Sequence, residues 1–455
     1  EPFQALMHRP VVVRDAVPLG SAGQIRLLDG IENRLGEGQP IPGLADVLGR
    51  AGVGFVVVRN DLRSTAAGSP QLAVIRALEW SGLPRAAIFG PSWTPPEESA
   101  DHFVDYRTVL SRPALEVFAV PHPRSAAVVP VAALVTANGG PEDLLRLAEA
   151  QAGQSTLLGS DAAALAQAQT TAGTALATRS WLTDGLRRRE VSFGAVSNRT
   201  SGLLTPDDPG RSTRRVIDVV ADKSAAPTVL HWDGVASVTA SSSASDATAT
   251  LRLSPAYTPS AAVDGDPATR WVSGHYGAAV GEWLRVDFTE PTSVSGLAAT
   301  FSGSSPIAAG PSVVAVETEQ GSITADVIAG VGRQLPSLPG LTRWVRIRLV
   351  ETDPGVQNGF SVEDLTIPGV RLRASAALPQ RDVPSAAASA PQAPERIVLG
   401  EGIRGRSDCL TLDGQPRCSP TLRLDPEELS WARTWSSAAG QEYDATGTVT
   451  PLPGA

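Results

Sequence analysis

The first half of the chain alternates between segments with helical and with strand-like spacing of apolar residues. Residues 25–35 and 44–50 repeat apolar side chains every three or four positions, which predicts helices with one buried face. Residues 54–61 (GFVVVRND) contain four consecutive apolar residues, three of them β-branched, and predict a buried strand. Further strand-like runs and a helix start at Pro141 continue the alternation. This order predicts an N-terminal α/β domain with a largely parallel sheet over residues 1–227.

From residue 228 to residue 371 the pattern changes to short strand candidates separated by Gly, Pro, Ser and Asp. Around residues 343–350 (RWVRIRLV) the period is two, so that Trp344, Arg346 and Arg348 share one face and apolar residues share the other. Evenly spaced strands with turn residues between them are typical of an antiparallel β-sandwich. We therefore expect a second domain of this class.

The C-terminal part divides into a linker and a further unit. Residues 372–395 are rich in Ala, Pro and Ser, which is typical of a linker. Residues 396–455 resume strand-like patterns but are too few for a sandwich, so we expect part of a further β-rich module. Its two cysteines, Cys409 and Cys418, frame the turn-forming stretch CLTLDGQPRC. A pair this close predicts one local disulfide formed in an oxidising compartment, with two free buried thiols as the alternative.

Charge and hydropathy limit the classes of partner. The 455 residues carry a formal net charge of −9, which argues against nucleic acid or an anionic membrane surface as a partner. No run reaches the ~18 to 20 apolar residues of a membrane span. The opening EPFQALMHRP lacks the basic start and apolar run of a signal peptide. We therefore expect this chain to be a piece of a longer protein.

No pattern in the sequence marks a catalytic site, and we assign no catalytic residue. HExxH, Walker and CxxC motifs are absent. The glycines of TANGGPED (136–143) can bind an anion at a helix start, but a plain strand-to-helix turn is the favoured explanation. TDGLRRREVSFG (183–194) carries three consecutive arginines. Arg187, Arg188 and Arg189 are candidates for holding a phosphate or carboxylate, and a solvated or interface ion-pair network is the alternative.

The stretch AVDGDPATRWVSG (262–274) concentrates oxygen atoms on a tight turn. The carboxylates of Asp264 and Asp266 and the hydroxyl of Thr269 suit a hard cation such as calcium. The same residues suit a plain turn in which Asp accepts hydrogen bonds from its own backbone. The local sequence leaves both interpretations open.

Five aromatic or imidazole side chains of this region are candidates for stacking on sugar rings. Trp271, His275 and Tyr276 lie in or beside the Asp264 loop, and we retain them as glycan-binding candidates. Trp283 and Trp344 lie inside strand patterns, where aromatic residues are more often part of the core.

The order AVDGDPATRWVSG, GEWLRVDF, RWVRIRL and FSVEDLTI resembles the discoidin-like fold of coagulation-factor type C domains and related carbohydrate-binding modules. In many such modules the Asp-Gly loop holds a structural calcium ion. The resemblance implies a calcium site made by the carbonyl of Ala262 and the side chains of Asp264, Asp266, Thr269 and Glu363.

A second resemblance covers nearly the whole chain. The stretches RDAVPLGSAGQIRLLDGIENRL, GVGFVVVRNDL, TDGLRRREVSFG and WDGVASVTASSSA resemble, in this order, the soluble region of the mycobacterial arabinofuranosyltransferase D family. These membrane enzymes add α-1,3-linked arabinofuranose from decaprenylphosphoryl arabinose to cell-wall arabinan. The resemblance implies a glycan-binding accessory region on the periplasmic side of a multi-pass membrane protein. Its partners would be cell-wall arabinan or another glycan and the membrane domain of the same polypeptide, where the catalytic residues would lie.

Two other functions remain as alternatives. The chain can be a stand-alone secreted lectin or adhesin, or an α/β enzyme in its own right. The missing signal peptide counts against the lectin, and the missing site constellation counts against the enzyme.

Overall fold

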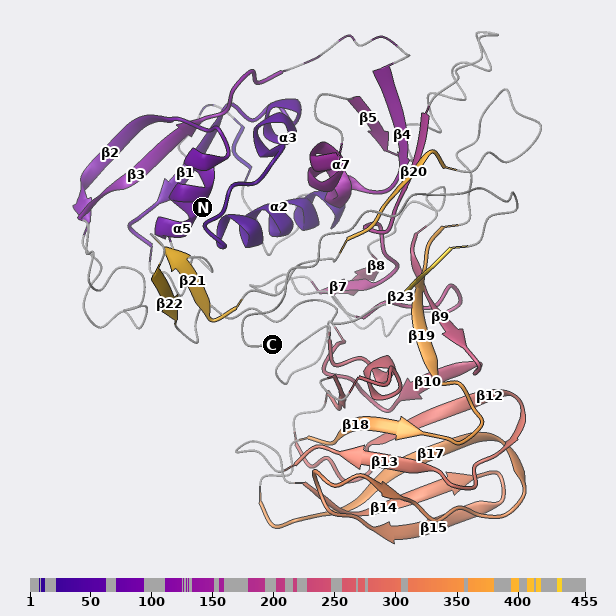
Figure 1. The fold of residues 1–455 in the computed structure, drawn as a ribbon. Helices are drawn as coiled ribbons and strands as arrows, with labels where there is room; N and C mark the ends of the chain where they lie inside the picture. The colour runs from indigo at the N-terminus through magenta and orange to yellow at the C-terminus, as the bar shows by residue number, and fades with distance from the viewer. Residues whose placement is uncertain are drawn as a thin grey trace, which may run out of the picture.

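The structure of the chain is a computed structural model (Figure 1). It describes residues 8, 10–12, 22–62, 71–93, 111–124, 126, 128, 130, 133–150, 155–158, 179–192, 202–208, 216–218, 227–246, 256–266, 269–274, 277–303, 310–355, 359–379, 394–400, 407–412, 415–418 and 432–435.

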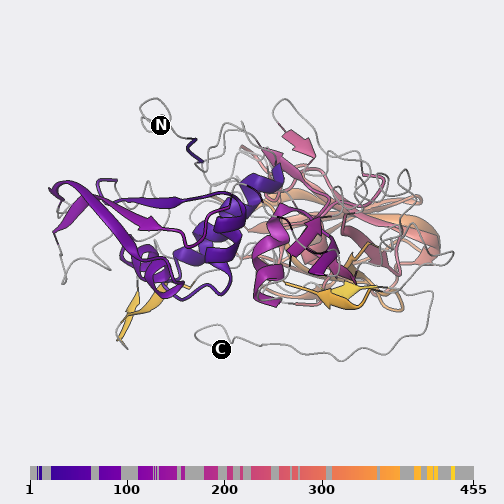
Figure 2. The ribbon, with the colours of Figure 1, turned by 90° about the horizontal axis from the view of Figure 1, so that it is seen from above.

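The N-terminal lobe packs helices against an antiparallel sheet. Its helices are α2 (Ala22–Leu35), α3 (Leu44–Arg50) and α5 (Gln71–Trp80). The sheet order is β1-β3-β2, with strands β1 (Phe55–Arg59), β2 (Arg85–Trp93) and β3 (Arg112–Ala119). Helices and sheet share a core that includes Leu44, Leu78 and Phe118. From above, this lobe projects to one side of the molecule (Figure 2).

The strand predicted within residues 54–61 is confirmed as β1, but the expectation that it is buried, within a largely parallel sheet, is wrong. β1 pairs with β3 in the antiparallel sense, and only Val58 of its five residues is buried. Phe55 and Val57 are 54% and 41% exposed. An antiparallel sheet covered on one face leaves alternate residues in solvent, and an apolar run does not reveal that.

The parallel sheet predicted from the alternation lies next to this lobe. Its order is β20-β6-β4-β5 and every pairing is parallel, which confirms the expected sheet type. The strands are β4 (Leu134–Asn138), β5 (Ser155–Leu158), β6 (Arg179–Thr183) and β20 (Arg396–Val398). After β4 the chain turns into the short η2 (Pro141–Asp143) and then α7 (Leu144–Ala150). All five residues of β4 are buried, as expected for a central strand.

The predicted antiparallel β-sandwich is confirmed. One sheet has the order β10-β12-β17-β14-β15 and the other β11-β18-β13-β16. Alternate residues of the first sheet, such as Leu284, Val345 and Ile347, point inward toward a core shared with Phe301 of the second sheet and Phe360 just before β18. The strands are β10 (Ser237–Ala240), β11 (Trp271–Val272), β12 (Trp283–Ser293), β13 (Ala298–Phe301), β14 (Pro311–Thr318), β15 (Gly321–Asp326), β16 (Arg333–Gln334), β17 (Leu341–Thr352) and β18 (Ser361–Thr366), with η3 (Pro259–Ala262) before β11.

Strands from distant parts of the sequence connect the sandwich to the rest of the molecule. β9 (Val229–Asp233) pairs with β19 (Arg373–Ala377), which also pairs with β23 (Ala432–Thr434). In Figure 1 this small sheet lies between the sandwich below and the parallel sheet above. Elsewhere β7 (Glu190–Ser192) pairs with β8 (Val216–Asp218). The segment after the linker therefore contributes β20 and β23 to sheets built by earlier residues.

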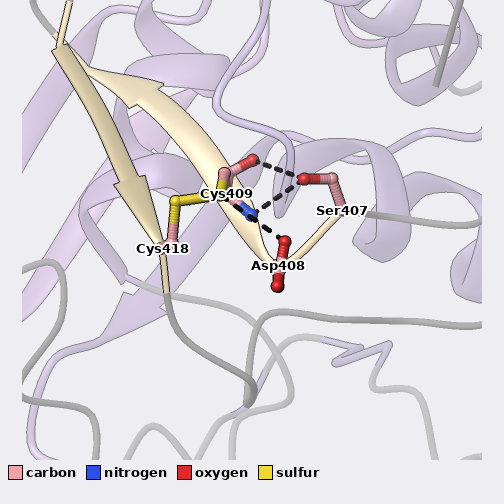
Figure 3. The surroundings of a disulfide bond; sticks show 4 residues. All are labelled: Ser407, Asp408, Cys409 and Cys418. Atoms are coloured by element: carbon pink, nitrogen blue, oxygen red, sulfur yellow. Dashed lines mark hydrogen bonds between the residues drawn. A yellow bond between two sulfur atoms is a disulfide. The ribbon is translucent and has the colours of Figure 1, made fainter. Parts of the chain in front are cut away.

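The expected disulfide between Cys409 and Cys418 is confirmed. It closes a hairpin of β21 (Cys409–Leu412) and β22 (Gln415–Cys418), in which the two cysteines are directly paired (Figure 3). The Ser407 hydroxyl accepts a hydrogen bond from the Cys409 backbone N–H at 2.8 Å at the base of this hairpin. Of the helices that the structure describes, none is long and apolar enough to cross a membrane.

Candidate functional site

The outward face of the five-stranded sheet carries a ladder of tryptophan and arginine side chains. β12 contributes Trp283 and Arg285, and β17 contributes Trp344, Arg346 and Arg348; we call these five residues the Trp/Arg ladder. They point outward because the residues between them, which include Leu284 and Ile347, fill the core.

The ladder is held by stacking of guanidinium groups on indole rings. The Arg285 guanidinium lies 4.6 Å from the centre of the Trp344 ring. The Arg346 guanidinium lies 5.6 Å from the Trp283 ring and 5.8 Å from the Trp344 ring. Such contacts stabilise by about 0.5 to 1 kcal/mol each at exposed sites. They fix the orientation of both indoles on a half-exposed surface.

Two carboxylates balance most of the positive charge of the ladder. Asp287 pairs with Arg285 at 2.6 Å, and Glu317 of β14 pairs with Arg346 at 2.5 Å and Arg348 at 2.7 Å. Burial acts to raise the pKa of Glu317, but the hydrogen bonds from Arg348 and Arg346 outweigh it and lower the pKa below its ordinary value. Glu317 is therefore ionised at neutral pH and clamps both guanidiniums.

The structure separates the three tryptophans that the sequence offered for stacking on sugars. Trp271 is fully buried, its indole N–H donates to the Ser242 carbonyl at 3.0 Å, and its ring packs edge-on against Phe360. It has no free ring face, so its selection as a glycan-binding candidate is wrong. Trp283 and Trp344, for which a core position was the alternative, lie on the outer face. The period-two alternation of residues 343–350 already placed Trp344 on the face of Arg346 and Arg348.

His275 and Tyr276, the other two glycan-binding candidates, lie outside the described residues.

The Asp264 loop is a tight turn closed by its own side chains. Gly265 has a φ of 77°, a left-handed conformation that favours glycine. The Asp266 N–H donates to Asp264 Oδ1 at 2.9 Å, which is the geometry of an Asx turn. Thr269 Oγ1 lies within 2.9 to 3.1 Å of the Asp264 carboxylate and of the carbonyls of Ala261 and Asp266. Burial raises the pKa of Asp264 above its ordinary value.

The predicted set of calcium ligands fits this loop only in part. The oxygens of Asp264, Thr269 and two carbonyls converge, and that donor set suits calcium. The converging carbonyl is that of Ala261, one residue before the expected Ala262. Glu363 is directed toward Arg270, at 3.9 Å, because the guanidinium offers it an opposite charge. Within the described part of the chain, no three His, Cys, Asp or Glu residues cluster as metal ligands.

The arginine run joins an interior network around Asp184. The Asp184 carboxylate is fully buried and contacts the guanidiniums of Arg187 and Arg146 at 3.3 Å and of Arg433 at 2.8 Å. It also accepts the Gly400 N–H at 3.0 Å. Arg187 is thus part of an internal ion-pair network, which favours the second of the two interpretations of this run.

The other two arginines of the run also face the protein. Arg188 donates to the Asp208 carbonyl at 2.7 Å. Arg189 is buried, and its charge partly opposes the rise in the pKa of Glu142 that burial causes. The described contacts show no open arginine cluster that presents all three guanidiniums to solvent.

Beside this network lie two acidic residues at the start of η2. Asp143 is buried and accepts the Gly140 N–H at 3.1 Å. Burial is the main cause, and the charge of Asp143 the second, that raises the pKa of Glu142 to about 7. Burial also raises the pKa of Asp143. The glycines of TANGGPED thus lie beside carboxylates of this chain, which favours the strand-to-helix turn over a site for an external anion.

Comparisons with known proteins extend over both halves of the chain. A family model described as the alpha-(1->3)-arabinofuranosyltransferase N-terminal GT-C domain matches residues 1–217. A second, described as the third carbohydrate binding module of arabinofuranosyltransferase D, matches residues 235–380. The second match covers the sandwich and β19.

Two curated relatives carry the name alpha-(1->3)-arabinofuranosyltransferase. The protein from Mycobacterium tuberculosis is 34% identical over 447 residues, covering 94% of this chain and 31% of the relative. That from Mycolicibacterium smegmatis is 35% identical over 478 residues, covering 98% and 32%. A cryo-EM structure of arabinofuranosyltransferase AftD from mycobacteria aligns with 96% of this chain and 34% of its own, at 32% identity and a TM-score of 0.77. The chain thus spans about a third of the length of these relatives.

Proposed function

Because this chain belongs to the arabinofuranosyltransferase D family, we propose that it is a glycan-binding accessory region of such an enzyme. The complete enzyme would transfer α-1,3-linked arabinofuranose from decaprenylphosphoryl arabinose to cell-wall arabinan. In this proposal the chain lies on the periplasmic side of the membrane, as part of a multi-pass membrane protein. The catalytic residues belong to the part of the polypeptide outside this chain.

One observation carries the proposal: the antiparallel sandwich is the region that matches a carbohydrate binding module. A glycan acceptor is a long polymer, and holding it near an active site raises its effective concentration without any catalytic group in the module. The sequence-based alternative of a stand-alone lectin accounts for the sandwich alone. It leaves unexplained why residues 1–217 match the N-terminal domain of a transferase.

We also propose a structural calcium ion at the Asp264 loop. The Asp264 carboxylate, the Thr269 hydroxyl and the carbonyls of Ala261 and Asp266 would hold it, since these oxygens already converge. The ion would neutralise the partly buried Asp264 and fix the loop against the sandwich.

Titration calorimetry of the full chain tests the proposed function. Arabinofuranosyl oligosaccharides are the probe, and malto-oligosaccharides of equal length are the control. We expect saturable binding of the arabinofuranosides, with little or none of the control sugars. The proposal fails if no glycan binds, or if both sugars bind equally through nonspecific contacts.

A further inference from the structure

We propose that the Trp/Arg ladder on the outer face of β12 and β17 is a binding surface for an extended, uncharged oligosaccharide. The inference rests on the proposed glycan-binding function and adds to it the surface and the class of ligand. The surface comprises Trp283, Arg285, Trp344, Arg346 and Arg348, with Asp287 and Glu317 as their carboxylate partners.

Strand register arranges these side chains in three successive rungs. Trp283 pairs with Arg348, Arg285 with Arg346, and Asp287 with Trp344. The two indoles therefore lie at opposite ends of the ladder, four residues apart along the strands. At about 3.4 Å per residue their backbone positions lie roughly 14 Å apart along the strands. Their rings lie closer together than that, since both are near the Arg346 guanidinium, at 5.6 Å and 5.8 Å. A surface of that length with a ring at each end fits an oligosaccharide of several units better than a single sugar.

The chemistry of the rungs suits sugars. Both indoles are only partly buried, so the apolar surface that the stacked guanidiniums leave open can contact the C–H groups of a sugar ring. The guanidinium and carboxylate groups between them can hydrogen-bond to sugar hydroxyls. Small-molecule sites generally combine aromatic surface with a few fixed polar groups in this way. The side chains of Arg285, Arg346 and Arg348 keep 32%, 32% and 36% of their surface exposed, so hydroxyls can reach them.

Charge balance argues for an uncharged ligand. Three guanidiniums face two carboxylates at 2.5 to 2.7 Å, so an anionic ligand would have to compete with partners already in place. Trp and Arg are also common in protein interfaces, so a protein occupant is the alternative that the test below separates. Covering this face with protein would bury two carboxylates and three guanidiniums.

The opposite face of the sandwich lacks such an arrangement. The outward positions of β13 and β18 hold small or polar side chains, among them Ala298, Thr300, Asp364 and Thr366. Among the described strands of the sandwich, two outward tryptophans thus occur on one sheet only. The sandwich therefore has one face with the aromatic surface that sugar stacking requires.

The test measures arabinofuranosyl oligosaccharide affinity in the full chain with Trp283→Ala, Trp344→Ala and both together. Trp80→Ala is a matched control, because Trp80 is an exposed tryptophan on α5 with a guanidinium, that of Arg76, 5.8 Å from its ring. Trp283→Phe and Trp344→Phe retain a ring and guard against loss of folding, which is checked by the unfolding midpoint.

We expect each alanine variant to bind about tenfold more weakly, with intermediate values for phenylalanine and an unchanged affinity for Trp80→Ala. Wild-type affinity in the folded double variant would overturn this surface while leaving the proposed function in place. If the same variants instead release another domain of the full enzyme and leave glycan binding intact, the face is a protein interface and the inference is wrong. Failure of the wild-type chain to bind any glycan would refute the proposed function itself.

Discussion

At the scale of single residues, glycines decide how the buried acids are accommodated. A Cβ atom at Gly185 would lie 1.9 Å from Asp143 Oδ1, and one at Gly139 would lie 2.4 Å from Thr183 Oγ1. The two sequence motifs TANGGPED and TDGLRRR therefore meet at Asp143, with glycine on each side. The sequence showed both motifs but not their contact, because residues 139 and 185 approach each other only through the pairing of β4 with β6.

Gly185→Ala should destabilise the fold. The added methyl group must displace a buried carboxylate, and overpacking of this kind costs about 1 to 3 kcal/mol. Gly54→Ala is the matched control, since a Cβ there would meet no atom within 4 Å and should change stability by less than about 0.5 kcal/mol. Denaturant unfolding of both variants measures the difference. Equal stabilities would contradict the packing around Asp143.

The Asp264 loop should respond to calcium. With the ion at about a hundred times its dissociation constant, binding to the folded state adds about 2.7 kcal/mol of stability. Thermal unfolding of the full chain with calcium and with chelator should show this as a higher midpoint, lost in Asp264→Asn. Asp326→Asn, at an exposed position of β15, should retain the calcium response. If the unfolding midpoint of the wild-type chain is the same with calcium and with chelator, the loop binds no calcium and is a plain Asx turn.

At the scale of elements, the hydrophobic period predicted which face of a strand is buried better than it predicted which strand it pairs with. The alternation in residues 343–350 placed Val345, Ile347 and Leu349 in the core, as the structure has them. The apolar run of β1 gave no information about pairing, because an antiparallel neighbour 56 to 64 residues away leaves no local pattern in the sequence. For the same reason the sequence did not reveal that β20 joins β6.

The start of η2 and α7 should make stability depend on pH. Burial and the neighbouring Asp143 raise the pKa of Glu142 from 4.5 to about 7 in the folded chain. The folded state then binds more protons than the unfolded state between these values, so the contribution of Glu142 to stability falls as pH rises from about 4.5 to 7. Above about pH 7 Glu142 is ionised in both states, and its burial lowers the free energy of unfolding by a constant amount.

Glu142→Gln should therefore stabilise the chain at pH 8, by on the order of 1 to 3 kcal/mol. The gain should shrink toward pH 5, where the wild-type carboxyl is protonated. Glu290→Gln, at an exposed position of β12, should show no such dependence. Unfolding midpoints of the three proteins from pH 5 to pH 8 give the comparison. A destabilised Glu142→Gln at pH 8 would show that the charge is favourably bound in the folded state.

At the scale of the whole molecule, Asp184 joins segments that are more than 200 residues apart. Its carboxylate contacts Arg146 on α7, Arg433 on β23 and the backbone of Gly400 beyond β20. Composition predicted a separate C-terminal module at 396–455. The described strands there, apart from the disulfide hairpin, instead complete sheets of the earlier regions. Sequence patterns show strands but not long-range ion pairs, so this connection could not be read from the chain.

Asp184→Asn should loosen this junction. Removing one partner of a buried ion pair costs about 3 to 5 kcal/mol, because the guanidiniums stay buried without their counter-charge. We expect faster hydrogen exchange in 394–400 and 432–435. Asp61→Asn removes the partly exposed pair with Arg59 and should cost at most about 1 kcal/mol. Unchanged exchange in both segments would show that β20 and β23 are held by other contacts.

Glycan binding by the sandwich of this chain is the property on which the proposed function depends. Hydrogen-exchange mass spectrometry of the full chain, with and without a saturating arabinofuranosyl oligosaccharide, tests it most directly because it locates the binding region without any substitution. We predict slower exchange within residues 235–380, strongest in β12 and β17, and little change in the N-terminal lobe. Protection confined to residues 1–217, or none at any concentration of the oligosaccharide, would contradict it.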